Sequence, residues 1–65
     1  MRSGKPCNGK RYVRNPAKKE VHDLNNEKTN CQIDEIKNPQ CFDSLSAAKA
    51  DGSNNCHYCI GNSTG

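Results

Sequence analysis

The chain has too few large apolar side chains to fold around a hydrophobic core alone. Its 65 residues include no tryptophan, one phenylalanine and two tyrosines, and only 31% of them are hydrophobic. Burying one large apolar side chain contributes about 1.5–3 kcal/mol, whereas ordering each residue costs on the order of 1.5 kcal/mol. Because these contributions nearly cancel in so short a chain, the fold needs a disulfide, a metal ion or a partner.

Long hydrophobic runs are also absent. No stretch approaches the roughly 20 apolar residues that span a bilayer, and no apolar run follows the N-terminal sequence MRSGKP. We therefore expect a cytoplasmic protein without a membrane partner, where cysteines bind metals or do chemistry more often than they pair. The alternative is a secreted peptide crosslinked by disulfides, although five cysteines leave one thiol over in a closed framework.

Acidic residues are missing from the first 19 positions. Residues 1–19 carry a charge of +7 and residues 20–65 carry −4, which together give the net charge of +3. Such a basic segment can bind phosphate backbones electrostatically, so nucleic acid is the leading candidate partner. Only Tyr12 offers base stacking there, and a protein partner is the alternative. The candidate nucleic-acid contacts are Lys10, Arg11, Arg14, Lys18 and Lys19.

Glycine, proline and polar residues divide the chain into one domain and two flanking segments. Residues 1–9 predict a flexible basic arm, residues 10–60 a single metal-binding domain, and residues 61–65 a flexible polar tail. Within the domain, residues 11–14 and 19–22 alternate apolar and polar side chains around a turn signal. They predict a β-hairpin, in which the two valines at 13 and 21 are core candidates.

Two short helices are expected after the hairpin. A capping-box pattern that starts at Thr29 predicts a helix over 30–37, with Ile33 and Ile36 on one face. A short strand is expected at Cys41-Phe42.

A second helix, over about 44–51, would be capped by Asp43 or Ser44 and closed by Gly52. The predicted fold class is therefore a small α+β zinc-stabilised domain, with a short β-hairpin plus two short helices around one metal site.

The most informative motif is the C-x-x-C sequence at 56–59. Two thiolates at this spacing are typical of half a tetrahedral zinc site. The remaining pair must come from His22, Cys31, Cys41, Cys7 and His57. The backbone can fix a ligand at His22, which ends an expected strand, and at Cys31, which lies in the first turn of an expected helix. Amide groups in a first helical turn favour a thiolate. Cys41 is the main competitor for the place of His22.

Two other candidate ligands are set aside. Cys7 lies in the expected arm and is interpreted as a free thiol, whereas Cys41 would otherwise be a small buried apolar residue. His57 lies between two ligating cysteines, where simultaneous coordination is awkward.

The C-terminal half resembles a known family. Phe42-Asp43-Ser44-Leu45, Ala48, Gly52 and the C-x-x-C at 56–59 are similar to the zinc-binding half of the Ada-type module. Its namesake is the N-terminal domain of the bacterial Ada DNA-methylation repair protein. The family has a short hairpin or sheet with helices around a single zinc, and the resemblance covers about residues 11–60. Together with the residue argument, it implies one zinc ion bound by His22, Cys31, Cys56 and Cys59.

The upstream ligand pair differs from that of the Ada module. There the pair is two cysteines spaced C-x3-C, and the first accepts a methyl group. The matching pair here is His22 and Cys31, with eight residues between them, so an imidazole replaces the thiolate nucleophile. An alkyl-accepting repair protein is therefore the least favoured of the function hypotheses.

Enzymatic activity is not expected. A site with four protein ligands is closed, and the sequence has no hydrolase or phosphate-binding motif. The expected function is a binding module with one structural zinc ion and no small-molecule substrate.

Overall fold

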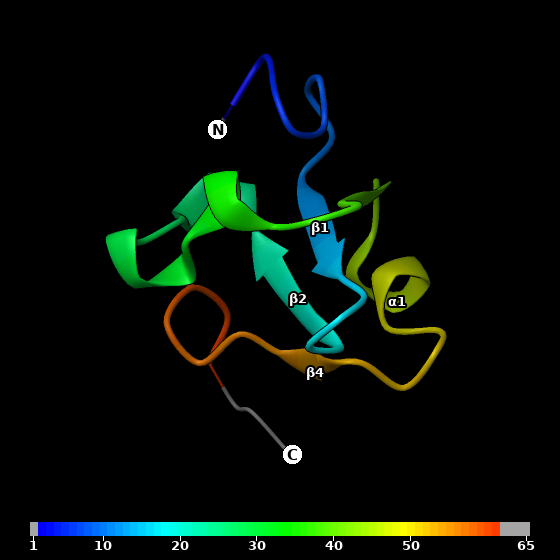
Figure 1. Ribbon diagram of the computed structural model, residues 1–65. Coiled ribbons are helices and arrows are strands. Elements are labelled where there is room, and N and C mark those ends of the chain that lie inside the picture. Colours follow the sequence, from blue (N-terminus) through cyan, green and yellow to red (C-terminus); the bar gives the residue numbers. More distant parts are fainter. Residues whose placement is uncertain (1, 62–65) are drawn as a thin grey trace.

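Four short strands form a mixed sheet in the order β3-β1-β2-β4 (Figure 1). The computed structural model describes residues 2–61. β1 (Tyr12–Asn15) and β2 (Glu20–Asp23) form an antiparallel hairpin. β3 (Gln40–Phe42) pairs antiparallel with β1, and β4 (Asn54–Asn55) pairs parallel with β2. The expected hairpin is present, but as the centre of a larger sheet.

The sheet separates two sets of side chains, because successive residues of a strand point to opposite faces. Val13 lies opposite His22 on β2 and opposite Cys41 on β3, so these three residues share one face. Arg14 and Val21 share the other face. On that face α1 (Leu45–Ala48) covers β1 and β3. The Arg14 guanidinium donates a hydrogen bond to the carbonyl of Ala48, the last residue of α1, at 3.0 Å.

The core on the first face is rich in sulfur. Val13, Leu24 and Ile33 supply its apolar carbon, and Val13 is 0% exposed. The remaining buried members are cysteines: Cys7, Cys31, Cys56 and Cys59. Val21 on the other face is the only other fully buried large aliphatic side chain among the described residues, so the domain buries little apolar area for its size.

The expectation of a helix over 30–37 is wrong. Two 3-10 turns, η2 (Thr29–Cys31) and η3 (Ile33–Glu35), replace it, and Gln32 between them is left-handed with a φ of 51°. Residues two apart on an α-helix point about 200° apart, so one helix could not bury Cys31 and Ile33 in the same cluster. The turn at Gln32 allows both to be buried. The expected capping box is also missing, because Lys28 occupies the N-cap position without a side-chain bond.

The second expected helix is shorter than predicted but begins as expected. Ser44 caps α1 by accepting a hydrogen bond from the backbone N–H of Ala47 at 3.2 Å. The α-helix ends at Ala48, and the chain then turns to Gly52, whose φ of 86° lies in the region that favours glycine. A further 3-10 turn, η1 (Leu24–Asn26), follows β2.

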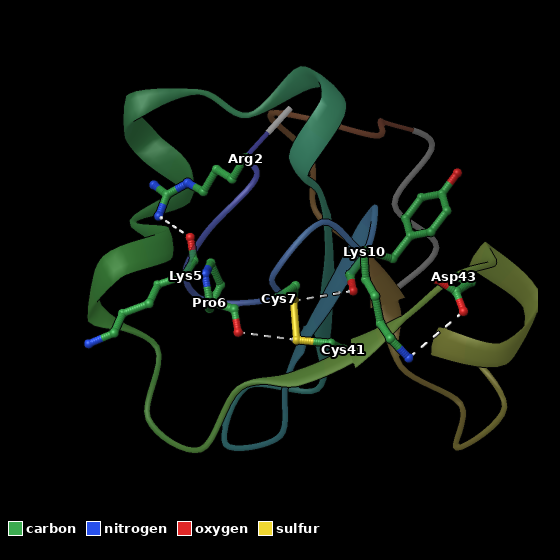
Figure 2. The surroundings of a disulfide bond; sticks show 8 residues. Arg2, Lys5, Pro6, Cys7, Lys10, Cys41 and Asp43 are labelled. Carbon is green, nitrogen blue, oxygen red and sulfur yellow. Dashed lines mark hydrogen bonds and ion pairs between the residues drawn. A yellow bond between two sulfur atoms is a disulfide. The ribbon is translucent and has the colours of Figure 1, made fainter.

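A disulfide joins Cys7 to Cys41 (Figure 2). The interpretation of Cys7 as a free thiol is therefore wrong, and Cys41 is not available as a metal ligand. Nearer the N-terminus, Arg2 forms ion pairs with Glu27 and Asp34, at N–O distances of 2.7 and 2.6 Å. The disulfide and these ion pairs attach the N-terminal segment to the rest of the domain.

Two expectations concern the remainder of the chain. Of the tail expected over 61–65, only Gly61 lies within the described residues. Within residues 2–61, no helix combines the length and the apolar character needed to cross a bilayer.

Candidate metal centre

Four buried side chains converge beside the sheet. The ligand atoms of His22, Cys31, Cys56 and Cys59 all lie within 4.8 Å of one another and could hold one metal ion. The four residues are between 2% and 6% exposed. They are the set derived from the sequence, whereas His57 is exposed.

Backbone pairing between β2 and β4 brings the second half of the chain to His22. The N–H of Cys56, directly after β4, donates to the carbonyl of Val21 at 2.8 Å. This bond continues the parallel ladder by one residue and places Cys56 beside His22. Sequence reasoning missed β4, because Asn54-Asn55 shows no apolar alternation and asparagine is depleted in strands.

A tight turn positions the C-x-x-C pair. The backbone N–H groups of Ile60 and Gly61 both donate to the carbonyl of Cys56, at 3.0 and 2.9 Å. Gly61 has a φ of 77°, which L-residues with side chains rarely adopt. The side-chain amide of Asn26 donates to the carbonyl of Cys59 at 2.9 Å, and so ties this turn to η1.

Two separations within the cluster match those between the ligands of a tetrahedral metal site, and the others are at most 4.8 Å. The sulfur atoms of Cys31 and Cys56 are 3.6 Å apart, and the Cys59 sulfur is 3.7 Å from Nδ1 of His22. Tetrahedral zinc, with Zn–S of about 2.3 Å and Zn–N of about 2.0–2.1 Å, has edges of roughly 3.6–3.8 Å between its ligand atoms. The backbone N–H of Asp23 also donates to the Cys59 sulfur at 3.3 Å, an interaction that stabilises a thiolate.

Burial shifts the protonation of the cluster toward its neutral forms. Desolvation raises the pKa of the Cys31 and Cys59 thiols and lowers the pKa of the His22 imidazole. A neutral imidazole is ready to coordinate a cation, whereas the buried thiols need a bound cation to become thiolates. The residues present therefore fit a divalent thiophilic metal.

The five basic residues predicted to contact nucleic acid are not equally available to bind a phosphate. Three are within ion-pair distance of acids: Lys10 with Asp43 at 3.8 Å, Arg11 with Asp23 at 3.0 Å and Arg14 with Asp51 at 3.2 Å. Figure 2 shows Lys10 directed toward Asp43. Arg11 and Arg14 also stack on Tyr12 and Phe42. Lys18 and Lys19 lie exposed in the hairpin turn.

Comparison with known proteins identified no relative of this chain. No protein-family model, no curated protein and no solved structure matches the chain. The resemblance to the Ada-type module therefore stays a prediction.

Proposed function

We propose that this protein is a small binding module whose fold is maintained by one structural zinc ion, bound by His22, Cys31, Cys56 and Cys59. The observation that carries the proposal is the convergence of these four buried ligand atoms within 4.8 Å. Thiolate and imidazole ligands favour zinc and other thiophilic ions over magnesium and calcium. Four protein ligands leave no position for a reactive water, so the zinc would be structural and the protein not an enzyme.

The sulfur-rich core explains why a metal would be needed. Zinc binding contributes an apparent free energy of about 10–16 kcal/mol to the folding of zinc-finger peptides at neutral pH. Among the described residues, four large aliphatic side chains are buried, Val13, Val21, Leu24 and Ile33. At about 1.5–3 kcal/mol each, they do not offset an ordering cost on the order of 1.5 kcal/mol per residue over the domain.

Native mass spectrometry of the purified protein tests the zinc proposal. We expect one zinc ion per chain, released on acidification together with loss of structure, because protons compete for the thiolates. Cys56→Ser and His22→Ala should lose zinc or bind it far more weakly. His57→Ala is the matched control, because His57 lies within the same turn but is exposed. A protein with the same unfolding midpoint in zinc and in chelator would refute the proposal.

We propose nucleic acid as the first partner to test, with Lys18 and Lys19 as the contact. These adjacent cations are exposed, and the described residues place no acid within ion-pair distance of either one. Binding to a DNA or RNA duplex should weaken steeply between 50 and 200 mM salt, roughly in proportion to the number of phosphates contacted.

A charge reversal distinguishes the two classes of partner. Lys18→Glu/Lys19→Glu should abolish binding, whereas Lys37→Glu, also exposed but outside the hairpin turn, should weaken it much less. An absence of salt-dependent binding in the wild type would instead favour a module that binds protein.

The disulfide bears on the compartment. Disulfides persist in oxidising environments, so the Cys7–Cys41 bond supports the alternative of a secreted, disulfide-crosslinked chain. The cytoplasmic location stays a prediction. Since Cys31, Cys56 and Cys59 are free, the zinc proposal holds in either compartment.

A further inference from the structure

The two ring nitrogens of His22 face different groups. Nδ1 is 3.7 Å from the sulfur of Cys59, whereas Nε2 is 3.8 Å from a carboxylate oxygen of Glu20. The His22 side chain is only 3% exposed, so water offers few partners for Nε2. The Glu20 carboxylate therefore lies on the Nε2 side of the ring, within ion-pair distance but beyond that of a hydrogen bond.

The register of β2 produces this arrangement. Glu20 and His22 are two residues apart in one strand, so both side chains point to the same face of the sheet. The backbone of Glu20 is fixed by pairing with Asn15 of β1 on one side and with Asn54 of β4 on the other. A small hollow of about 100 Å³, lined by His22, Cys31, Glu20 and Glu35 among others, opens beside the cluster.

We propose that Glu20 is a positioning residue for the metal centre: its carboxylate accepts the Nε2–H of His22 and so leaves Nδ1 unprotonated and directed at the metal. The inference rests on the proposed zinc site. A neutral imidazole carries one proton, which must be on Nε2 if Nδ1 is the ligand. An ionised carboxylate can only accept a hydrogen bond, and therefore selects that tautomer. The carboxylate is 40% exposed, which leaves it room to turn toward the ring and shorten the 3.8 Å separation.

Zinc affinity measured by competition with a chromophoric chelator tests the role of Glu20. We expect Glu20→Ala to weaken zinc binding by about 10–100-fold, the usual cost of removing an outer partner of a metal-bound histidine. Glu20→Gln should retain more affinity than Glu20→Ala, because its amide oxygen still accepts the hydrogen bond. Glu35→Gln is the matched control, since Glu35 lines the same hollow but forms no ion pair with His22.

A second readout separates positioning from a general loss of charge. In the zinc-loaded wild type, NMR of the His22 ring should show a proton on Nε2 that exchanges slowly with water. In zinc-loaded Glu20→Ala this proton should exchange faster. Equal losses of affinity in Glu20→Ala and Glu20→Gln, or in Glu20→Ala and Glu35→Gln, would assign the effect to charge and overturn the inference.

The remaining outcomes distinguish the two proposals. If the wild type and Glu20→Ala bind zinc equally tightly, with unchanged exchange of the Nε2 proton, the inference fails and the zinc site stands. If the wild type binds no zinc, both fail.

Discussion

Removal of the Cys7–Cys41 disulfide is expected to lower the free energy of unfolding by about 4 kcal/mol. The two cysteines are 34 residues apart in sequence, and the chain-entropy model assigns roughly this value to a loop of that length. A domain of 65 residues has a total free energy of unfolding of roughly 3–10 kcal/mol. The disulfide therefore accounts for a large part of the stability, and its loop contains β1, β2 and the ligands His22 and Cys31.

Urea unfolding of Cys7→Ser/Cys41→Ser, followed by far-UV circular dichroism, measures this contribution. With saturating zinc, the double variant should remain folded but unfold at a lower urea concentration than the wild type. With chelator, it should be largely unfolded without urea, because both crosslinks are then missing. Wild type held in a reductant that does not bind zinc is the control and should match the double variant.

Equal midpoints for the double variant and the oxidised wild type, in zinc and in chelator alike, would refute this reasoning. Alkylation of the urea-unfolded, metal-free wild type identifies the cause of such a result. Three cysteines should react before reduction and all five after it, because Cys31, Cys56 and Cys59 are the free thiols. Five reactive thiols before reduction would mean that the disulfide does not form.

Two further predictions concern the core and the N-terminal ion pairs. Leu24 is 1% exposed, so Leu24→Ala should lower the free energy of unfolding by about 2–5 kcal/mol. The control Lys37→Ala, at an exposed position, should change it by less than about 0.5 kcal/mol. Similar values for both variants in thermal unfolding would contradict the described core. The hydrogen bond from Arg2 lowers the pKa of Glu27 below its usual value. The Arg2–Glu27 pair should therefore contribute to the free energy of unfolding at neutral pH, by about 0.2–1 kcal/mol for a partly exposed pair. This contribution should be lost as the pH falls through the lowered pKa. Arg2→Gln should thus be less stable than the wild type at pH 7 in low salt, and the difference should shrink at about 1 M salt, which screens exposed ion pairs. A difference that salt leaves unchanged would show that Arg2 acts through packing.

The parts of the fold that could be predicted from the sequence are local. Alternation around a turn predicted the hairpin with Val13 and Val21, and Ser44 was one of two residues expected to cap the second helix. The C-x-x-C at 56–59, the expected places of His22 and Cys31, and the resemblance to the Ada-type module together predict the cluster that the structure brings together.

The parts that could not be predicted depend on distant residues. β4 exists because it extends a ladder formed with β2, more than 30 residues earlier in the chain. Gln32 is left-handed because Cys31 and Ile33 must both face one core. The position of Cys7 in the expected arm predicts a free thiol, whereas the fold pairs it with Cys41, 34 residues later, and leaves Cys31, Cys56 and Cys59 free.

The hydrogen bond from the Asp23 amide to the Cys59 sulfur makes one backbone proton a sensor of the whole cluster. That amide lies in β2 next to His22, and Arg11 holds the side chain of the same residue through two hydrogen bonds of 3.0 Å. Its proton can exchange with deuterium only when β2 separates from the turn that carries Cys59. The rate at which this single amide takes up deuterium therefore reports how often β2 and the turn that carries Cys59 separate, and the measurement needs no attached label.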